Sequence, residues 1–393
     1  MSGKIETDKA MPDTLAVVAG RDPRRFYGFV NTPVFRGSTV LFPNAETLRN
    51  RDAPYIYGCI GGPTHEALEE AVAAIEGGYK TRVTSSGLAA ITLVLLAYAS
   101  AGDHILVVDN VYGPTRRLAD TIFTKFGVQT TYFDPGLGAD IKNLMRENTK
   151  LVLFESPGSQ TFEMVDVPAI AAAARAHGVM TIMDNTWASP AYFKPFAHGV
   201  DVSIQAATKY IVGHSDAMLG TVTTTKAHWP ALDAAYLASG MCAAPDDIYL
   251  ALRGLRTMNV RLAHHMKAGI EMAKWLQDRP EVDHVRHPAL PTHPGHHIWK
   301  RDFLGASGLF GFVLKPCPQA AEDAFLDTLK LFGMGYSWGG FESLIISFNP
   351  RAYRTATRWN AGGPAFRIHI GLEDVKDLKA DLASGFEALK AAG

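Results

Sequence analysis

An aspartate and a lysine stand 25 positions apart, each at the end of an apolar run. Asp184 closes the run Val179–Asp184 and opens the tetrad Asp184-Asn185-Thr186-Trp187, while Lys209 follows the run Val200–Ile204. A carboxylate in such a place could keep the nitrogen of an aromatic ring protonated, and a lysine amine could form an imine with an aldehyde. Taken singly, an aspartate here is more often a turn residue and a lysine is more often solvated, so the pair needs further matching residues.

The segment Thr84-Ser85-Ser86-Gly87-Leu88 offers a phosphate site, because free backbone amides at the start of a helix bind anions. Tyr112 follows the apolar run His104–Asp109, where its ring could stack on a planar ligand. An aldehyde, a ring nitrogen and a phosphate are the groups by which a protein holds pyridoxal 5′-phosphate (PLP). The order and spacing of these residues therefore predict a PLP site, with Lys209 for the aldehyde and Asp184 for the ring nitrogen.

Short β-rich runs alternate with helical patterns up to about residue 210. This alternation predicts an α/β fold with a mostly parallel sheet and helices on both faces. We expect strands at residues 82–85, 104–109, 129–133, 151–155 and 179–184, and helices at 63–78, 88–101 and 167–177. Ligands of such sheets bind at the carboxyl ends of the strands, where Gly87, Tyr112 and Asp184 fall.

The length of 393 residues and a hydrophobic content of 47% predict more than one domain. We divide the chain into an N-terminal arm (1–60), a large PLP-binding domain (61–253) and a smaller C-terminal α/β domain (254–393) with a long helix at 257–278. The arm shows turn residues and little periodicity. Arms of this kind often lie across a partner subunit.

Charge and cysteine content exclude several classes of partner. Lys plus Arg (38) nearly equals Asp plus Glu (39), so neither nucleic acid nor a membrane is expected as a partner. Three cysteines without paired spacing and a polar start without a signal peptide predict a cytoplasmic protein. We expect no metal site, because His293, His296 and His297 lie in a Pro-rich loop without carboxylates. His264 and His265 are expected to be solvated on a charged helix.

Four segments carry a resemblance to a known family: Ser203–Gly220, Arg253–Arg261, Tyr336–Leu344 and Arg367–Asp374. They resemble the Cys/Met-metabolism family of PLP enzymes, which have the aspartate-aminotransferase-like fold, and the resemblance runs from about Thr32 to the C-terminus. Within this family the chain is most similar to the bacterial cystathionine β-lyases. Their tryptophan after Asp-Asn-Thr is Trp187 here, and their Tyr-Ser-Trp-Gly-Gly segment is Tyr336 to Gly340. The γ-specific relatives tend to have a glutamate where this chain has Tyr336.

The resemblance implies a role for each matching residue. The residues that would hold PLP are Lys209 by a covalent bond, Asp184 at the ring nitrogen, Tyr112 by stacking, Gly87, Leu88 and Thr208 at the phosphate, and Tyr57 at the phosphate of a neighbouring subunit. Lys209 and Tyr112 would be catalytic. The substrate would bind through its α-carboxylate to Arg367, in a pocket lined by Ser337, Trp338, Tyr336 and Trp187. A site shared between subunits implies a homo-oligomer, expected to be a dimer of dimers.

One position departs from the family. The family usually has Tyr-x-Arg before the first helix of the large domain, and its arginine holds the neighbour's phosphate. Here the segment reads Tyr57-Gly58-Cys59, so that charge is missing unless Arg51, Lys80 or Arg82 supplies it.

The implied activity is a β-elimination that converts cystathionine to homocysteine, pyruvate and ammonia, a reaction of methionine biosynthesis. Lys209 would act first as base and then as acid. A γ-eliminating lyase and a cysteine desulfhydrase remain as alternatives, and Cys59 motivates a PLP-free regulatory homologue. A nucleotide-dependent dehydrogenase is disfavoured because no G-x-G-x-x-G follows an early strand.

Overall fold

A seven-stranded sheet forms the centre of the larger part of the protein in the computed structural model, which describes residues 9–393. Its strands, in the order β1-β7-β6-β5-β4-β2-β3, are β1 (Lys80–Thr84), β2 (His104–Val108), β3 (Gln129–Phe133), β4 (Thr149–Glu155), β5 (Met180–Asp184), β6 (Val202–Gln205) and β7 (Gly220–Thr224). Strands β2 to β6 pair in parallel, whereas β7 runs antiparallel to both of its neighbours, β1 and β6. The prediction of a mostly parallel sheet is confirmed, but β7 was not foreseen.

Helices cover both faces of this sheet. They are α3 (Pro63–Glu76), α4 (Gly87–Tyr98), α5 (Gly113–Leu118), α6 (Val167–Ala176), α7 (Ser189–Tyr192), α8 (Trp229–Ser239) and α9 (Pro245–Leu255). On one face of β6, Ser203 and Gln205 donate to Glu76 at the end of α3, at 2.9 and 2.7 Å. The alternate residues Val202 and Ile204 join the apolar cluster that contains α4.

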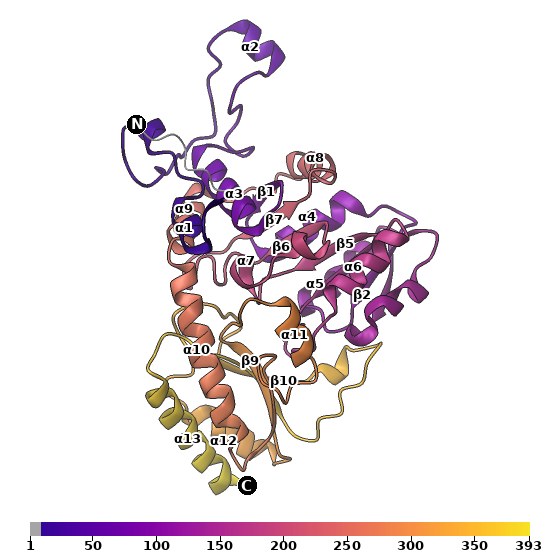
Figure 1. Ribbon diagram of the computed structural model, residues 1–393, viewed down its shortest axis with the longest axis vertical. Helices are drawn as coiled ribbons and strands as arrows, with labels where there is room; N and C mark the ends of the chain where they lie inside the picture. Colours follow the sequence, from indigo (N-terminus) through magenta and orange to yellow (C-terminus); the bar gives the residue numbers. More distant parts are fainter. Residues whose placement is uncertain (1–8) are drawn as a thin grey trace.

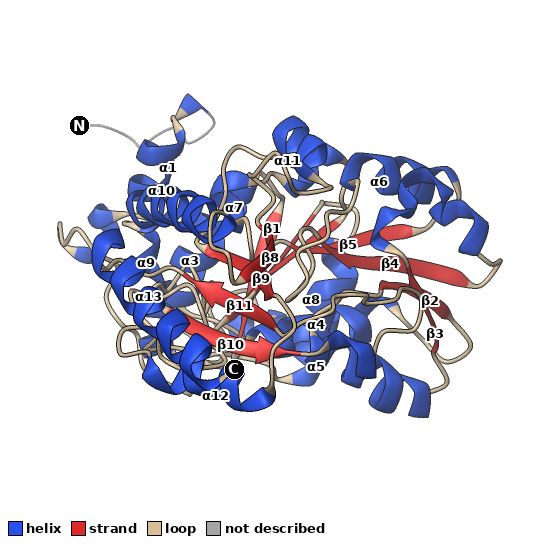
Figure 2. Ribbon diagram, turned by 90° about the horizontal axis from the view of Figure 1, so that it is seen from below, coloured by secondary structure: helices blue, strands red, loops and turns tan. Residues whose placement is uncertain are grey.

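The C-terminal part holds a second, antiparallel sheet in the order β10-β11-β9-β8. Its strands are β8 (Val282–Arg286), β9 (Leu309–Leu314), β10 (Leu344–Phe348) and β11 (Ala365–His369), and its helices are α10 (Met258–Gln277), α11 (His296–Asp302), α12 (Gln319–Thr328) and α13 (Val375–Ala392). Helices α10, α12 and α13 share one apolar core with the sheet (Figure 2). The division placed after residue 253 falls within α9, and the domain limits stay a prediction.

The N-terminal arm projects from the body of the molecule. It contains α1 (Pro12–Val18) and α2 (Ala45–Asn50), and Figure 1 shows α2 at the end of a long excursion away from both sheets. Large apolar side chains of the arm are open to solvent, among them Tyr27 (98% exposed) and Leu41 (87% exposed). The first part of the arm packs against the body through the buried Ala16 and Ala19, whereas α2 has no buried residue.

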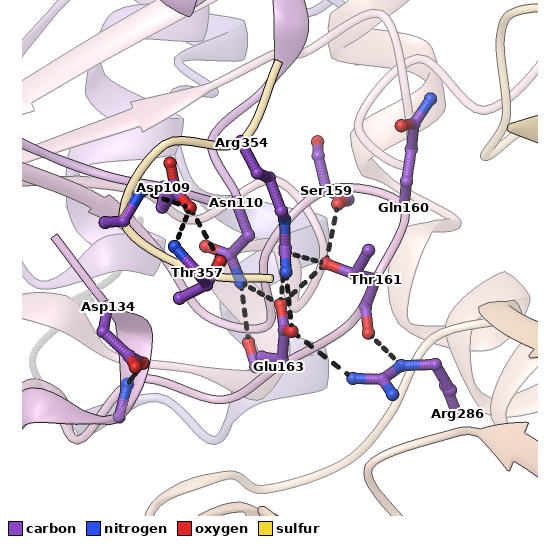
Figure 3. A network of polar contacts seen from close by, with 12 residues as sticks. Asp109, Asn110, Asp134, Ser159, Gln160, Thr161, Glu163, Arg286, Arg354 and Thr357 are labelled. Atoms are coloured by element: carbon purple, nitrogen blue, oxygen red, sulfur yellow. Dashed lines mark hydrogen bonds and ion pairs between the residues drawn. The ribbon is translucent and has the colours of Figure 1, made fainter. Parts of the chain in front are cut away.

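The loop between β10 and β11 fastens the small sheet to the large one (Figure 3). Asp109, which follows β2 and is fully buried, accepts the backbone N–H groups of Thr355 and Thr357 at 3.0 and 2.8 Å. Beside it, Arg354 donates to Glu163 at 2.9 Å. A buried carboxylate with several donors is held firmly, so the two sheets meet in a fixed arrangement close to the turn that carries Tyr112.

Two general findings concern the described residues 9–393. No helix among them is both long and apolar enough to cross a membrane. Nor do three or more of their histidine, cysteine, aspartate and glutamate side chains come together as a metal-binding group.

Candidate active site

Two acids lie side by side at the carboxyl ends of neighbouring strands. Glu155 ends β4 opposite Asp184 at the end of β5. The buried Glu155 accepts the backbone N–H of Tyr112 at 2.7 Å and that of Ser159 at 3.1 Å. Burial and the neighbouring Asp184 raise the pKa of Glu155 to about 8, so this residue keeps its proton near neutral pH. The sequence analysis did not single out Glu155, although it ends a predicted strand just as Asp184 does.

Asp184 is suited to hold a protonated ring nitrogen. Its Oδ1 accepts the backbone N–H of Thr186 at 3.0 Å and also the Thr186 hydroxyl, which in turn accepts the backbone N–H of Ala206 at 2.8 Å. Because both bonds go to Oδ1, Oδ2 remains for a ligand. Burial raises the pKa of Asp184, and the two bonds from Thr186 oppose this rise. A cationic partner would therefore stabilise the ionised form.

The start of α4 is suited to a phosphate. Ser86 caps this helix by accepting the backbone N–H of Ala89 at 3.1 Å, which leaves the first helical N–H groups, those of Gly87 and Leu88, for an anion. A Cβ added to Gly87 would lie 2.7 Å from the Cβ of Ala206, so the helix begins directly against the segment that leads to Lys209. Only glycine permits this close approach.

The hydroxyl of Thr208 is already engaged. It donates to the backbone carbonyl of Leu219 at 3.1 Å and accepts the N–H of the same residue at 2.9 Å. A hydroxyl has a single hydrogen, so Thr208 would have to give up the first bond to donate to a phosphate. Its phosphate role stays a prediction.

The side chain of Lys209 is largely buried, and the opposite charges of Asp184 and Arg367 both act on its amine. Its Nζ donates to the Ser337 hydroxyl at 2.9 Å and lies 5.4 Å from the ring centroid of Trp338. Burial and the charge of Arg367 lower the pKa of Lys209 to about 8, while Asp184 acts in the opposite direction. Such a lysine supplies a neutral amine near physiological pH, which a nucleophile or a general base requires.

Arg367 approaches the same space from β11. Its Nη2 donates to the backbone carbonyls of Gly335, Tyr336 and Ser337 at 3.3, 3.1 and 3.2 Å. Burial lowers the pKa of Arg367 to about 10, so the guanidinium stays charged at neutral pH. The structure thus brings Lys209, Ser337 and Arg367 together, although they are far apart in the sequence.

The remaining expected site residues differ in their surroundings. The pKa of the Tyr112 hydroxyl is raised overall. Burial is the main cause, Asp184 and Glu155 add to it, and Arg367 opposes it. Tyr336 is 89% exposed. Trp187 is buried, and its indole N–H donates to the carbonyl of Leu309 at 2.8 Å. This contact gives Trp187 a packing role, and its assignment to the substrate stays a prediction. Tyr57 is half-exposed on the arm, and its assignment to the phosphate of the neighbouring subunit stays a prediction as well.

Asp184 ends β5 and Lys209 follows the adjacent strand β6, beside a helix that begins with free amides. This arrangement on a mostly parallel sheet is that of the PLP enzymes with the aspartate-aminotransferase-like fold, and the three groups fit the ring nitrogen, aldehyde and phosphate of the cofactor.

Comparison with known proteins narrows this class. The chain belongs to the family described as Cys/Met metabolism PLP-dependent enzymes, whose model matches residues 13–387. It is 53% identical over 379 residues to a putative cystathionine beta-lyase of Rhizobium johnstonii, with 95% of each chain covered. It is 45% identical over 386 residues to a cystathionine beta-lyase of Escherichia coli, covering 95% of this chain and 98% of that one. The structure is similar to that of a cystathionine gamma synthase from Xanthomonas oryzae pv. oryzae (TM-score 0.90, 33% identity, 98% of this chain and 100% of that one). The protein is therefore a PLP-dependent enzyme.

Proposed function

We propose that this enzyme cleaves L-cystathionine by β-elimination, taking up one water and releasing homocysteine, pyruvate and ammonia. The observation that carries the proposal is the position of Lys209 Nζ, 2.9 Å from the hydroxyl of Ser337, whose backbone carbonyl accepts from Arg367. The names of the Rhizobium and Escherichia relatives support the choice of substrate.

Each step needs a group that the site supplies. Bound PLP would provide an electron sink for the charge left at the substrate Cα. Lys209 Nζ would take the Cα proton and then deliver a proton to the departing sulfur, with help from the Tyr112 hydroxyl. Arg367 would grip the α-carboxylate with its planar fork and so hold Cα within reach of Lys209. Asp184 would keep the ring nitrogen protonated.

We further propose that a second copy of this chain covers the arm. The arm exposes Tyr27, Phe29 and Leu41, and exposed apolar side chains gathered on one segment mark an interface. Tyr57 lies on the same arm and would then reach the phosphate of the neighbour's cofactor. A closed assembly of two such dimers gives the expected homotetramer.

The three free cysteines suit the reducing cytoplasm.

The test is to give L-cystathionine to the PLP-loaded enzyme and to identify both products. Homocysteine together with pyruvate is expected. If the products were cysteine and 2-oxobutanoate, the reaction would be γ-elimination instead of β-elimination. Faster turnover of cysteine than of cystathionine would favour a cysteine desulfhydrase. Light scattering of the same sample tests the assembly, since a monomer would contradict the role given to the arm.

A further inference from the structure

The segment Tyr336–Gly340 lies directly against Lys209. Ser337 accepts the hydrogen bond from Lys209 Nζ at 2.9 Å. Gly339 has a φ of +86°, and a Cβ added there would lie 3.0 Å from both Cα and Cβ of Lys209. The segment therefore touches the lysine at its backbone and at its amine, so the position of the segment influences where the amine lies.

Two side chains of strand β11, those of Arg367 and His369, form hydrogen bonds to the backbone of this segment. Arg367 donates to the carbonyls of its first half, as described above. Two residues farther along the same strand, His369 reaches the second half: its Nε2 lies 3.2 Å from the backbone N of Gly339 and 3.2 Å from the backbone O of Gly340. Residues i and i+2 of a strand share a face, so one face of β11 carries both supports.

The imidazole of His369 is neutral. Its side chain is buried, and burial, followed by the neighbouring His265, places its pKa well below the ordinary value for histidine. A neutral Nε2 without hydrogen accepts from Gly339, whereas Nε2–H donates to Gly340. In both tautomers the ring thus keeps a bond to the segment. Within residues 9–393, Nδ1 has no hydrogen-bond partner, so Nε2 provides the polar link.

His369 and Arg367 differ in what they would do during a reaction. Arg367 would also bind the substrate carboxylate, through donors other than the Nη2 that holds the carbonyls. His369 is buried, and it bonds Gly339 and Gly340, which are buried as well. Of the two supports, His369 is therefore the one that takes no part in substrate binding in the proposed function.

We propose that His369 is a positioning residue of the reaction: through Gly339 and Gly340 it holds the segment that places Ser337 Oγ against Lys209 Nζ. This inference rests on the role of Lys209 in the proposed function. Within residues 9–393, neither ring nitrogen of His369 bonds to the amine of Lys209, so it acts through the segment.

The neighbouring His265 offers a matched control. Contrary to the expectation of a solvated residue, His265 is fully buried, because its face of α10 packs onto the end of β11. Its ring centroid lies 5.2 Å from that of His369, and its Nδ1 lies 2.8 Å from the carbonyl of Ile370. His265 thus packs against His369 but has no hydrogen bond to the segment. Replacing His265 therefore measures the loss of stability that comes from disturbed packing around His369 alone.

The experiment compares His369→Leu, His369→Gln and His265→Leu as PLP-loaded enzymes. The readouts are Tm, the pH titration of the visible absorbance of the bound cofactor without substrate, and kcat and KM. Leu removes the polar link, whereas the Gln amide can reach the place of Nε2. We expect His369→Leu to shift the titration midpoint and to lower kcat by about tenfold with little change in KM, since a neutral hydrogen bond is lost. His369→Gln should behave like the wild type, and His265→Leu should lower Tm alone.

Equal titrations and equal kcat values in His369→Leu and His265→Leu would overturn the proposal. If His369→Leu does not fold, His369→Asn takes its place, because its shorter amide cannot reach Gly339; the same behaviour in the Asn and Gln variants would then overturn it. The titration needs no substrate. A wild type that leaves cystathionine intact would therefore refute the proposed reaction without deciding the role of His369.

Discussion

Lys209 and Ser337 lie on loops attached to different sheets and meet where the two sheets adjoin, with 2.9 Å between Nζ and Oγ. Lys209 follows β6 of the large sheet, and Ser337 precedes β10 of the small one. The reactive amine is thus positioned by the way the two sheets are joined. The buried carboxylate of Asp109 and the pair Arg354–Glu163 fix that junction.

Replacing Lys209 with Ala removes both the anchor of the cofactor and the proton carrier. We expect kcat to fall by about 10²–10⁴-fold, the usual contribution of a general acid–base group. The exposed Lys226→Ala is the matched control and should keep normal turnover. Steady-state kinetics with added PLP measure both, and near-normal turnover of Lys209→Ala would refute the assignment.

Arg367→Ala should weaken substrate binding more than cofactor binding. A charge-assisted contact is worth about 1.5–3 kcal/mol, or roughly a tenfold to hundredfold rise in KM. Arg367→Lys keeps a charge but not the planar guanidinium that can bind a carboxylate through two nitrogens, so we expect an intermediate KM. An unchanged KM for cystathionine in Arg367→Ala would remove Arg367 from the carboxylate site.

Cys59→Arg should tighten PLP binding, because a guanidinium on the arm would meet the phosphate dianion of the neighbouring subunit. The expected gain is about 1.5–3 kcal/mol, or roughly tenfold to a hundredfold in Kd. Of the residues that could already supply this charge, Arg82 is held by Asp233 and Glu69, which leaves Arg51 and Lys80. Cys59→Ala is the control for loss of the thiol. Equal PLP affinities of wild type and Cys59→Arg would mean that the charge is present already or is not needed.

Glu155 should make the PLP-free protein less stable as pH rises. Its pKa is raised from 4.5 to about 8, so between these values the unfolded chain loses a proton that the folded protein keeps, and the free energy of unfolding falls. Glu155→Gln cannot ionise. Its stability relative to the wild type should therefore increase from about pH 5 to about pH 8.5 in urea unfolding. The exposed Glu147→Gln should show no such trend, and a flat difference for Glu155→Gln would contradict the raised pKa.

Local patterns predicted much of the large sheet. The expected helix at 63–78 is α3 (Pro63–Glu76), and the expected strand at 129–133 is β3, because apolar periodicity and turn residues mark such elements directly. Strand β7 was missed, since the Thr-rich run Gly220–Thr224 has little apolar pattern and is buried only between β1 and β6.

Site residues were predicted only where the residue type and its place in the sequence indicate a chemical role. Lys209, Asp184 and Arg367 were named in advance, whereas Glu155 and His369 were not. The role of Glu155 depends on the N–H of Tyr112, and that of His369 on Gly339 and Gly340, partners that only the tertiary structure brings close. His265 was expected in solvent for the same reason: the residues that bury it are distant in the sequence.

The most direct test of the account is to locate the cofactor. The PLP-loaded enzyme is treated with borohydride, digested, and mapped by mass spectrometry. Lys194 is the competing candidate, because burial lowers its pKa as well, although its amine donates to the carbonyls of Ile75 and Pro190. The account predicts loss of the visible band and a reduced cofactor on Lys209. A cofactor on Lys194 or on another lysine, or no reducible band after PLP is added, would contradict it.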